Sequence, residues 1–485
     1  MPYLPTIGLE IHIELKTKTK MFCRCLNDPD EKRPNVNVCP VCLGHPGTLP
    51  VINKEAVKKT IKTGLALNCQ IPDYSKFDRK NYFYPDLPKG YQISQLYLPL
   101  CQDGFLEIDE KKVRVREIHL EEDTGRLIHP QGQAYSLVDF NRAGVPLMEL
   151  VTEPDLTSAK EAKQFAQELQ LILRYLEVSY ADMEKGQMRV EANISIGKDS
   201  STDEKKLGTK VEIKNLNSFR SVERGIEYEI ERQTEILKSG KKVIQETRGW
   251  DDIKGVTVSQ REKEFAHDYR YFPEPDLPPL SHAKEFIDEI KAEAPELPQE
   301  RRERFKKEYN LEEKIIEVFA QNKDLGDYFE KAISELPPNL SKENLSKLIR
   351  LASNYLITDL QGLLKGVQVS GEDFLITPKN FAKFITLIYE GKISSKMAKI
   401  LLGEMFKTGA DPLHIIKEKE LIQITDTAEI EKIIKEVILK NPKVVEDYKS
   451  GKETAIQYLI GQVMAKTQGK ASPELVKEIL TKLLT

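Results

Sequence analysis

Apolar and polar residues alternate strictly near the start of the chain. Apolar side chains occupy every second position from Ile7 to Leu15, and the positions between them carry Gly8, Glu10, His12 and Glu14. A period of two residues predicts a strand with one buried face. The same alternation occurs in KKVRVREIHLE (111–121), GQMRVEANISI (186–196) and TKVEIKNL (209–216).

One helix stands out among these strands. Ser158 followed by Glu161 forms a capping box, the usual start of a helix. The apolar residues that follow recur at helical spacing and share one face: Ala162, Phe165, Ala166, Leu169, Ile172, Leu173 and Leu176. Groups of strands with a few inserted helices predict an α+β fold with a mostly antiparallel sheet.

The pattern changes after proline-rich punctuation in PEPDLPPLS (273–281) and EAPELPQERRERF (293–305). Beyond it the spacing is helical, with little strand signal. KTGADP (407–412) separates two helical groups. We therefore expect three domains: residues 1–292, an α+β domain; residues 293–408, an all-helical domain; and residues 409–485, a helical tail.

The composition is that of a soluble globular protein, with 40% hydrophobic and 31% charged residues. A formal charge of −4 excludes an overall electrostatic attraction to nucleic acid, although not a local basic patch. No apolar run approaches the roughly 20 residues that span a bilayer. No signal-peptide pattern is present either, so we expect a cytoplasmic protein that does not bind membranes.

Four of the six cysteines form the pattern C-x-C-x13-C-x2-C, at Cys23, Cys25, Cys39 and Cys42. Paired knuckles of this kind predict tetrahedral zinc, because each turn presents two thiolates to one ion. A set of four thiolates leaves no position open for a substrate, so the predicted site is structural. The alternative is a group of buried cysteines without a metal.

Carboxylates and imidazoles recur on the polar faces of the predicted strands. Glu10 and His12 lie two residues apart and therefore on one face, and His119 and Glu121 repeat this relation. Glu149 stands in the apolar context PLMELV. Oxygen ligands with an imidazole suit a magnesium ion that serves phosphates. From spacing alone, these residues are also compatible with an ordinary solvated strand face.

Basic and aromatic residues alternate in FDRKNYFYPDLPKGYQ (77–92), which contains Arg79, Lys80, Tyr82 and Lys89. Such a loop is typical of a segment that binds a nucleotide or RNA. It is equally compatible with a loop that its tyrosines fix to the core. Candidate orienting groups for a ligand follow at Arg189, Glu191, Asn193 and Lys214. The sequence contains no P-loop, dinucleotide fingerprint or nucleophile elbow. Nucleotide chemistry would thus require an atypical site.

Several long strings together resemble the GatB family, which forms one subunit of the tRNA-dependent aspartyl/glutamyl amidotransferases. They are GLEIHIELKTKTKMF, NYFYPDLPKGYQISQ, HLEEDTGR, DFNRAGVPLMELVTEPD, VEIKNLNSFRSVERG and DYRYFPEPDLPPL. The resemblance implies a cradle related to the glutamine synthetase/guanidino kinase fold, followed by a helical domain and a YqeY-like tail that binds tRNA.

The resemblance also implies a reaction and partners. Members of this family work in a heterotrimer, in which an amidase subunit (GatA) releases ammonia from glutamine and a small subunit (GatC) ties the amidase to GatB. GatB uses ATP and Mg2+ to phosphorylate the side-chain carboxylate of Glu-tRNA(Gln), of Asp-tRNA(Asn), or of both. Ammonia then displaces phosphate, and Gln-tRNA(Gln) or Asn-tRNA(Asn) results.

Matching strings place the family's magnesium site at Glu10, His12, Glu121 and Glu149. The same comparison implies that Lys80 and Lys89 lie near the ammonia route and the phosphate pocket, with Arg79, Tyr82, Arg189, Glu191, Asn193 and Lys214 as nucleotide-binding candidates. Two rival interpretations stay open. One is a non-catalytic tRNA-binding adaptor, and the other is a stand-alone ligase for a small amino acid.

Overall fold

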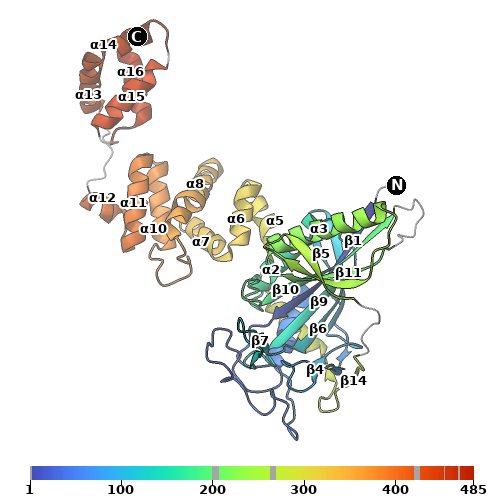
Figure 1. Cartoon of the computed structure of the whole chain (residues 1–485). Coiled ribbons are helices and arrows are strands. Elements are labelled where there is room, and N and C mark those ends of the chain that lie inside the picture. Colours follow the sequence, from blue (N-terminus) through green and yellow to red (C-terminus); the bar gives the residue numbers. More distant parts are fainter. Residues whose placement is uncertain are drawn as a thin grey trace. The chain divides into compact units, whose positions relative to one another are not determined.

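The computed structural model describes residues 3–198, 207–262, 269–419, 427–452, 454–467 and 470–484. The chain divides into two compact units, Met1–Leu297 and Pro298–Thr485 (Figure 1). The first unit is built on strands and the second consists of helices, as the α+β prediction with a helical C-terminal part requires. The fold class predicted from the sequence is confirmed.

An eight-stranded sheet organises the first unit, in the order β13-β12-β11-β10-β1-β9-β6-β5. Its strands are β1 (Tyr3–Glu14), β5 (Cys101–Ile108), β6 (Lys111–Glu122), β9 (Pro146–Thr152), β10 (Met188–Lys198), β11 (Val211–Leu216), β12 (Glu246–Asp251) and β13 (Val256–Glu262). Among these strands, β11 and β12 pair in parallel and the other neighbours are antiparallel. The first strand of the chain therefore lies inside the sheet, between β10 and β9.

Three helices cover one face of this sheet: α1 (Lys54–Ala66), α2 (Ala159–Tyr175) and α3 (Phe219–Lys238). The apolar residues of β1, from Ile7 to Ile13, are at most 1% exposed and join the helices in one core. The N–H of Glu161 bonds to the hydroxyl of Ser158 at 3.2 Å, so α2 begins where the sequence predicted. Polar residues of the strands therefore gather on the opposite face.

Short strands edge the first unit. They are β2 (Tyr74–Ser75), β3 (Asp78–Asn81), β4 (Tyr91–Ser94), β7 (Arg126–Ile128), β8 (Leu137–Asp139), β14 (Phe272–Pro273) and β15 (Leu280–Ser281). Through them the proline-rich stretch 272–281 pairs with residues 74–79. Helix α4 (Lys284–Ala292) closes this unit with Ile290 in its core.

The described residues of the second unit form two separate hydrophobic cores. The first core is formed by α5 (Pro298–Tyr309), α6 (Glu313–Gln321), α7 (Lys323–Ser334), α8 (Lys342–Asn354), η1 (Tyr355–Leu360), α9 (Gln361–Leu364), α10 (Pro378–Tyr389), α11 (Ser395–Thr408) and α12 (Pro412–Glu418). The second core is formed by α13 (Thr427–Lys440), α14 (Pro442–Lys449), α15 (Ala455–Lys466) and α16 (Pro473–Leu484). Ile415 and Ile416 of α12 are buried in the first of these cores, so that core extends beyond the domain boundary expected at 408.

Candidate active site and metal centres

The four knuckle cysteines come together in one cluster. Their sulfur atoms lie within 4.8 Å of one another, and the Sγ atoms of Cys39 and Cys42 are 3.9 Å apart. Zn–S bonds of about 2.3 Å in a tetrahedron place the sulfurs roughly 3.8 Å apart, so the arrangement fits the ion. The cluster is consistent with a structural zinc site.

Lys20 lies against this cluster and is fully buried. Its Nζ is 3.8 Å from Sγ of Cys42 and donates a hydrogen bond to the carbonyl of Phe140 at 3.2 Å. A hydrogen bond from Cys23, with a further contribution from the Lys20 charge, lowers the pKa of Cys42 to about 5. Lys20 could not be predicted as part of this site, because no local pattern distinguishes it from the neighbouring Lys16 and Lys18.

A row of polar side chains crosses the open face of the sheet. In the register of the strands, Glu149 of β9 stands opposite His12 of β1 on one side and His119 of β6 on the other. Oε2 of Glu149 lies 3.4 Å from Nε2 of His12 and 3.0 Å from Nε2 of His119. Arg189 of β10 stands opposite His12 and continues the row.

Glu121 joins this row from β6. One carboxylate oxygen lies 3.9 Å from Nε2 of His12, and the donor atoms of His12, Glu121 and Glu149 are within 4.8 Å of one another. Glu121 also accepts a hydrogen bond from Ser94 at 3.1 Å. We call His12, Glu121 and Glu149 the central triad. Imidazole and carboxylate donors at this spacing are able to hold one divalent cation.

The pKa values of the two carboxyl groups of the central triad are shifted in opposite directions. Burial would raise the pKa of Glu149, but the imidazoles of His119 and His12 hold it well below its ordinary value. Burial and the Glu149 charge instead raise the pKa of Glu121. Lys80 loses solvation by burial, yet Glu121, Tyr271 and Glu149 raise its pKa above the usual value. The site thus combines two carboxylates with an ammonium group that stays charged.

Glu10 lies on the same sheet face but in a different group. Its carboxylate clusters with Glu191 and Glu212 and accepts a hydrogen bond from Asn193 at 2.7 Å. Lys214 bonds to Glu191 at 2.6 Å and lies 3.2 Å from Glu212. The structure therefore divides the residues predicted for magnesium: three form the central triad, and Glu10 belongs to this second acidic group.

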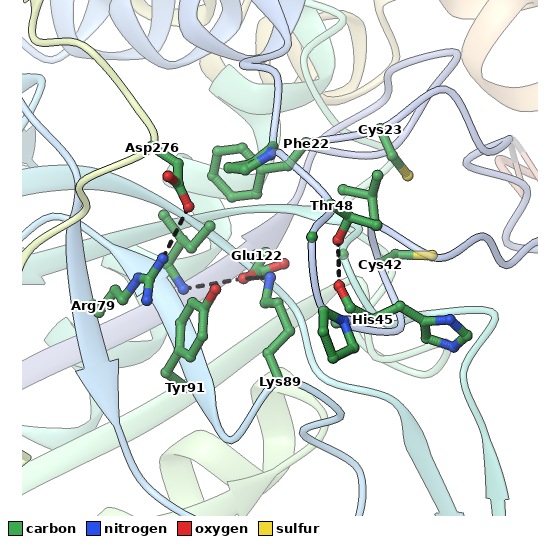
Figure 2. A pocket seen from close by; sticks show the side chains of 17 residues that line it. Phe22, Cys23, Cys42, His45, Thr48, Arg79, Lys89, Tyr91, Glu122 and Asp276 are labelled. Carbon is green, nitrogen blue, oxygen red and sulfur yellow. Dashed lines mark hydrogen bonds and ion pairs between the residues drawn. The ribbon is translucent and has the colours of Figure 1, made fainter.

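Lys89 and Arg79 line a pocket beside the cysteine cluster (Figure 2). Lys89 forms an ion pair with Glu122, and both side chains are more than 90% buried. Arg79 makes a bidentate contact with Glu274 at 2.7 and 2.9 Å and reaches Asp276 at 3.2 Å. Figure 2 shows the sulfurs of Cys23 and Cys42 on the other side of the same pocket.

Aromatic rings surround Lys80. Its Nζ lies 5.1 Å from the ring centre of Tyr269 and 6.0 Å from that of Tyr82, and these two rings meet edge to face. Tyr269 belongs to the string 268–276, in which Asp268 is outside the described residues. This string also supplies the carboxylates that hold Arg79. The local pattern of this string predicts neither of these contacts.

Other residues near the triad were not predicted as site residues. The buried Asp123 accepts a hydrogen bond from Arg189 at 2.9 Å, and Arg142 lies 3.6 Å from the same oxygen. Asp123 and Glu122 follow Glu121 directly in the string HLEEDTGR. The run of three acidic residues is visible in the sequence, but the sequence does not show which residue each of them contacts.

Comparison with known proteins identifies the family. Residues 5–288 match the model of the GatB/GatE catalytic domain, and residues 327–484 match that of the GatB domain. The chain belongs to the GatB family. Its full-length relatives include the B subunits of the aspartyl/glutamyl-tRNA(Asn/Gln) amidotransferases of Thermotoga maritima and Caldicellulosiruptor bescii.

The Thermotoga protein is 49% identical over all of this chain and 99% of its own length. The Caldicellulosiruptor protein is 50% identical over 99% of this chain and 98% of its own. The corresponding protein of Thermoanaerobacter pseudethanolicus is 47% identical over the whole of both chains. The resemblance seen in the sequence is thereby confirmed for this GatB-family chain. Among the described residues, no helix has the length and apolar character needed to cross a bilayer.

Proposed function

We propose that this chain activates the side-chain carboxylate of glutamate on tRNA(Gln), of aspartate on tRNA(Asn), or of both, at the expense of ATP. The activated group then reacts with ammonia to give Gln-tRNA(Gln) or Asn-tRNA(Asn). Membership of the GatB family supports this assignment. The observation that carries it is the central triad, whose three donor atoms lie within 4.8 Å on the polar face of the sheet.

The reaction needs a phosphoryl step because a carboxylate is a poor acyl donor. A carboxylate oxygen attacks the γ-phosphorus of ATP, and ADP leaves. Ammonia then attacks the carbonyl carbon of the acyl phosphate, and inorganic phosphate departs with the C–O bond electrons. The first step depends on positioning and on neutralising charge rather than on a protein nucleophile.

His12, Glu121 and Glu149 are the residues that would hold Mg2+ in this proposal. A bound magnesium ion neutralises phosphate charge and aligns the phosphoryl group. Lys80, whose raised pKa keeps it charged, would offset the negative charge of the transferred group. The second acidic group lies beside the central triad on the same sheet face. We propose that the nucleotide is oriented by Glu10, Glu191, Asn193 and Lys214, together with Arg189, Arg79 and Tyr82.

The chain is proposed to work with two partners, the amidase GatA, which releases ammonia, and the small protein GatC, which joins the amidase to this chain. Lys89 beside Glu122 is proposed to lie on the route of ammonia toward the activated carboxylate. The tail helices are proposed to bind the body of the tRNA.

Co-expression with candidate GatA and GatC proteins tests the assignment. The purified complex should amidate Glu-tRNA(Gln) or Asp-tRNA(Asn) when ATP, Mg2+ and glutamine are present. ATP hydrolysis should depend on the mischarged tRNA, which a non-catalytic adaptor would not produce. Amidation of free glutamate at the same rate would instead support the stand-alone ligase. Absence of amidation of both tRNAs by an intact complex would refute the proposal.

A further inference from the structure

The aliphatic stem of Lys89 packs directly against the backbone of Gly44. Gly44 belongs to the turn that carries Cys39 and Cys42, which we call the cysteine knuckle. A Cβ atom placed on Gly44 would lie 2.5 Å from Cγ of Lys89 and 3.0 Å from its Cα. Side-chain carbons do not approach this closely, so only glycine leaves room for the lysine. Gly44 also has a φ of +69°, in the left-handed region that favours glycine.

The position of Gly44 is fixed by the turn that carries the cysteines. Its N–H donates to the carbonyl of Val41 at 3.1 Å, and the N–H of Leu43 donates to that of Cys39 at 3.0 Å. Sγ of Cys42 accepts from the N–H of Cys39 at 3.2 Å. This is the turn that presents Cys39 and Cys42 to a metal, so an ion held by these sulfurs also fixes Gly44.

The other end of Lys89 is held by the strands. Its ammonium group pairs with Glu122, and Glu122 accepts a second hydrogen bond from the N–H of Ile93 at 3.0 Å. The Lys89 Nζ lies 5.8 Å from the ring centre of Phe22, the residue before Cys23. The knuckle therefore contacts the stem of Lys89, while Glu122 of β6, itself bonded to Ile93 of β4, holds the ammonium group. Figure 2 shows Lys89 beside Glu122.

We propose that the cysteine knuckle is a positioning element for Lys89, acting through Gly44, in addition to stabilising its own loop. The functional consequence rests on the role proposed above for Lys89. The contact itself does not, and the two are tested separately.

Amine labelling measures the contact. The full-length chain is pulsed with an acetylating reagent, and the rate at Lys89 is divided by that at the exposed Lys241. In Gly44→Ala the added methyl group displaces the lysine stem, and the ratio should rise at least about fivefold. Gly47→Ala is the matched control. Gly47 also has a positive φ, +85°, but a Cβ there meets nothing within 4 Å, so its ratio should equal the wild-type value.

Zinc removal provides a second measurement that needs no variant. Chelation of the wild-type chain should raise the labelling ratio of Lys89 in the direction seen for Gly44→Ala. An unchanged ratio after zinc loss would overturn the role of the metal-held turn. Equal ratios for Gly44→Ala and Gly47→Ala would overturn the role of Gly44.

The functional part is measured in the assembled complex with ammonium as nitrogen donor. Amidation should fall at least about fivefold in Gly44→Ala relative to wild type, with its zinc content retained. An inactive wild-type complex would contradict the proposed function and leave the labelling result standing. An active Gly44→Ala complex with a loosened Lys89 would show that the position of Lys89 does not matter for amidation.

Discussion

His12 and His119 approach the same carboxylate oxygen of Glu149 from opposite sides, at 3.4 and 3.0 Å. The relationship follows from the sheet, because β9 runs between β1 and β6 and places the three residues in one row. Glu149 consequently stays ionised although it is largely buried. A negative oxygen fixed in this way is a prepared ligand for a cation.

Replacing Glu121 or Glu149 with Gln removes that negative charge while keeping side-chain size. We expect tRNA-dependent ATP hydrolysis and amidation to fall by about three decades, which corresponds to roughly 4 kcal/mol of transition-state stabilisation. Folding and tRNA affinity should be retained. Single-turnover assays on the assembled complex measure the first effect, and filter binding measures the second.

Glu107→Gln is the control for these variants. Glu107 is an exposed glutamate on β5 of the same sheet, and its loss of charge should leave activity at the wild-type level. Near-normal amidation by both Glu121→Gln and Glu149→Gln would show that these carboxylates form only a polar strand face.

Lys20 should slow the release of zinc from the cysteine cluster. We expect about one zinc ion per chain, lost when any of the four cysteines becomes Ser. A four-thiolate zinc site carries net negative charge, and the buried Lys20 offsets it. Lys20→Met should therefore release zinc to a colorimetric chelator at least about tenfold faster than the wild type. The exposed Lys18→Met should behave as the wild type does. Protein purified without chelator yet free of zinc would contradict the assignment.

Removal of the tail should weaken tRNA binding. The cut belongs after Glu418, because α12 is packed in the preceding core. Four lysines of the tail are candidates for phosphate contacts: Lys449, Lys452, Lys466 and Lys470. Of these, Lys452 pairs with Asp447 at 2.8 Å and Lys466 pairs with Glu436. Exposed ion pairs of this kind are weak, so phosphates can replace the carboxylates.

In the protein without its tail we expect at least about a tenfold loss of tRNA affinity and a smaller dependence of tRNA binding on salt. Glutaminase activity of the complex should persist without tRNA. Equal affinity with and without the tail would refute this role.

The isolated chain should not hydrolyse glutamine. Four cysteines are gathered in the cysteine cluster, and burial raises the pKa of the Cys69 and Cys101 thiols, which disfavours the nucleophilic thiolate. Ammonium should nevertheless replace glutamine as the nitrogen source. Ammonia release from glutamine by the purified chain, measured with a coupled dehydrogenase assay, would contradict this expectation.

His282 should make the first unit less stable in mild acid. Its Nε2 lies 2.9 Å from Oγ of the buried Ser75, and burial lowers its pKa below the ordinary 6.5. As the pH falls through about 6.5, His282 therefore binds a proton in the unfolded chain, whereas in the folded chain it binds one only at lower pH. The stabilisation is present above about pH 6.5 and is lost as the pH falls toward the folded pKa.

The difference in melting temperature between about pH 7.5 and pH 5.5 should therefore be smaller in His282→Gln than in the wild type. His129→Gln is the control, since His129 also contacts a serine, Ser136 at 2.7 Å, but is exposed. An identical pH response in wild type and His282→Gln would exclude this contribution.

Local pattern predicted a large part of this structure. Alternation along β1 correctly placed Glu10 and His12 on one face of that strand, and alternation along β6 did the same for His119 and Glu121, because side-chain direction in a strand depends only on parity. The capping box likewise fixed the start of α2. Parity does not give the register between strands. Glu10 was therefore predicted to share a metal site with His12, whereas the sheet places Glu10 opposite Glu191.

Contacts between distant segments were beyond local pattern. Arg79 meets Glu274, and Lys89 meets Glu122, only because β3, β14, β4 and β6 pair or pack as they do. No feature within 77–92 distinguishes a lysine that contacts a carboxylate from one that faces solvent. The resemblance to a family supplied candidates here, and the geometry supplied their partners.

The central place of β1 has a consequence for synthesis of the protein. Ile7 pairs with Ile194, so β1 leaves the ribosome well before β9 and β10, the strands with which its backbone hydrogen bonds form. At ordinary elongation rates that delay is about 10 to 40 seconds. During it the alternating isoleucines of β1 have no sheet to enter, which makes this nascent segment a natural client for chaperones that hold exposed strands.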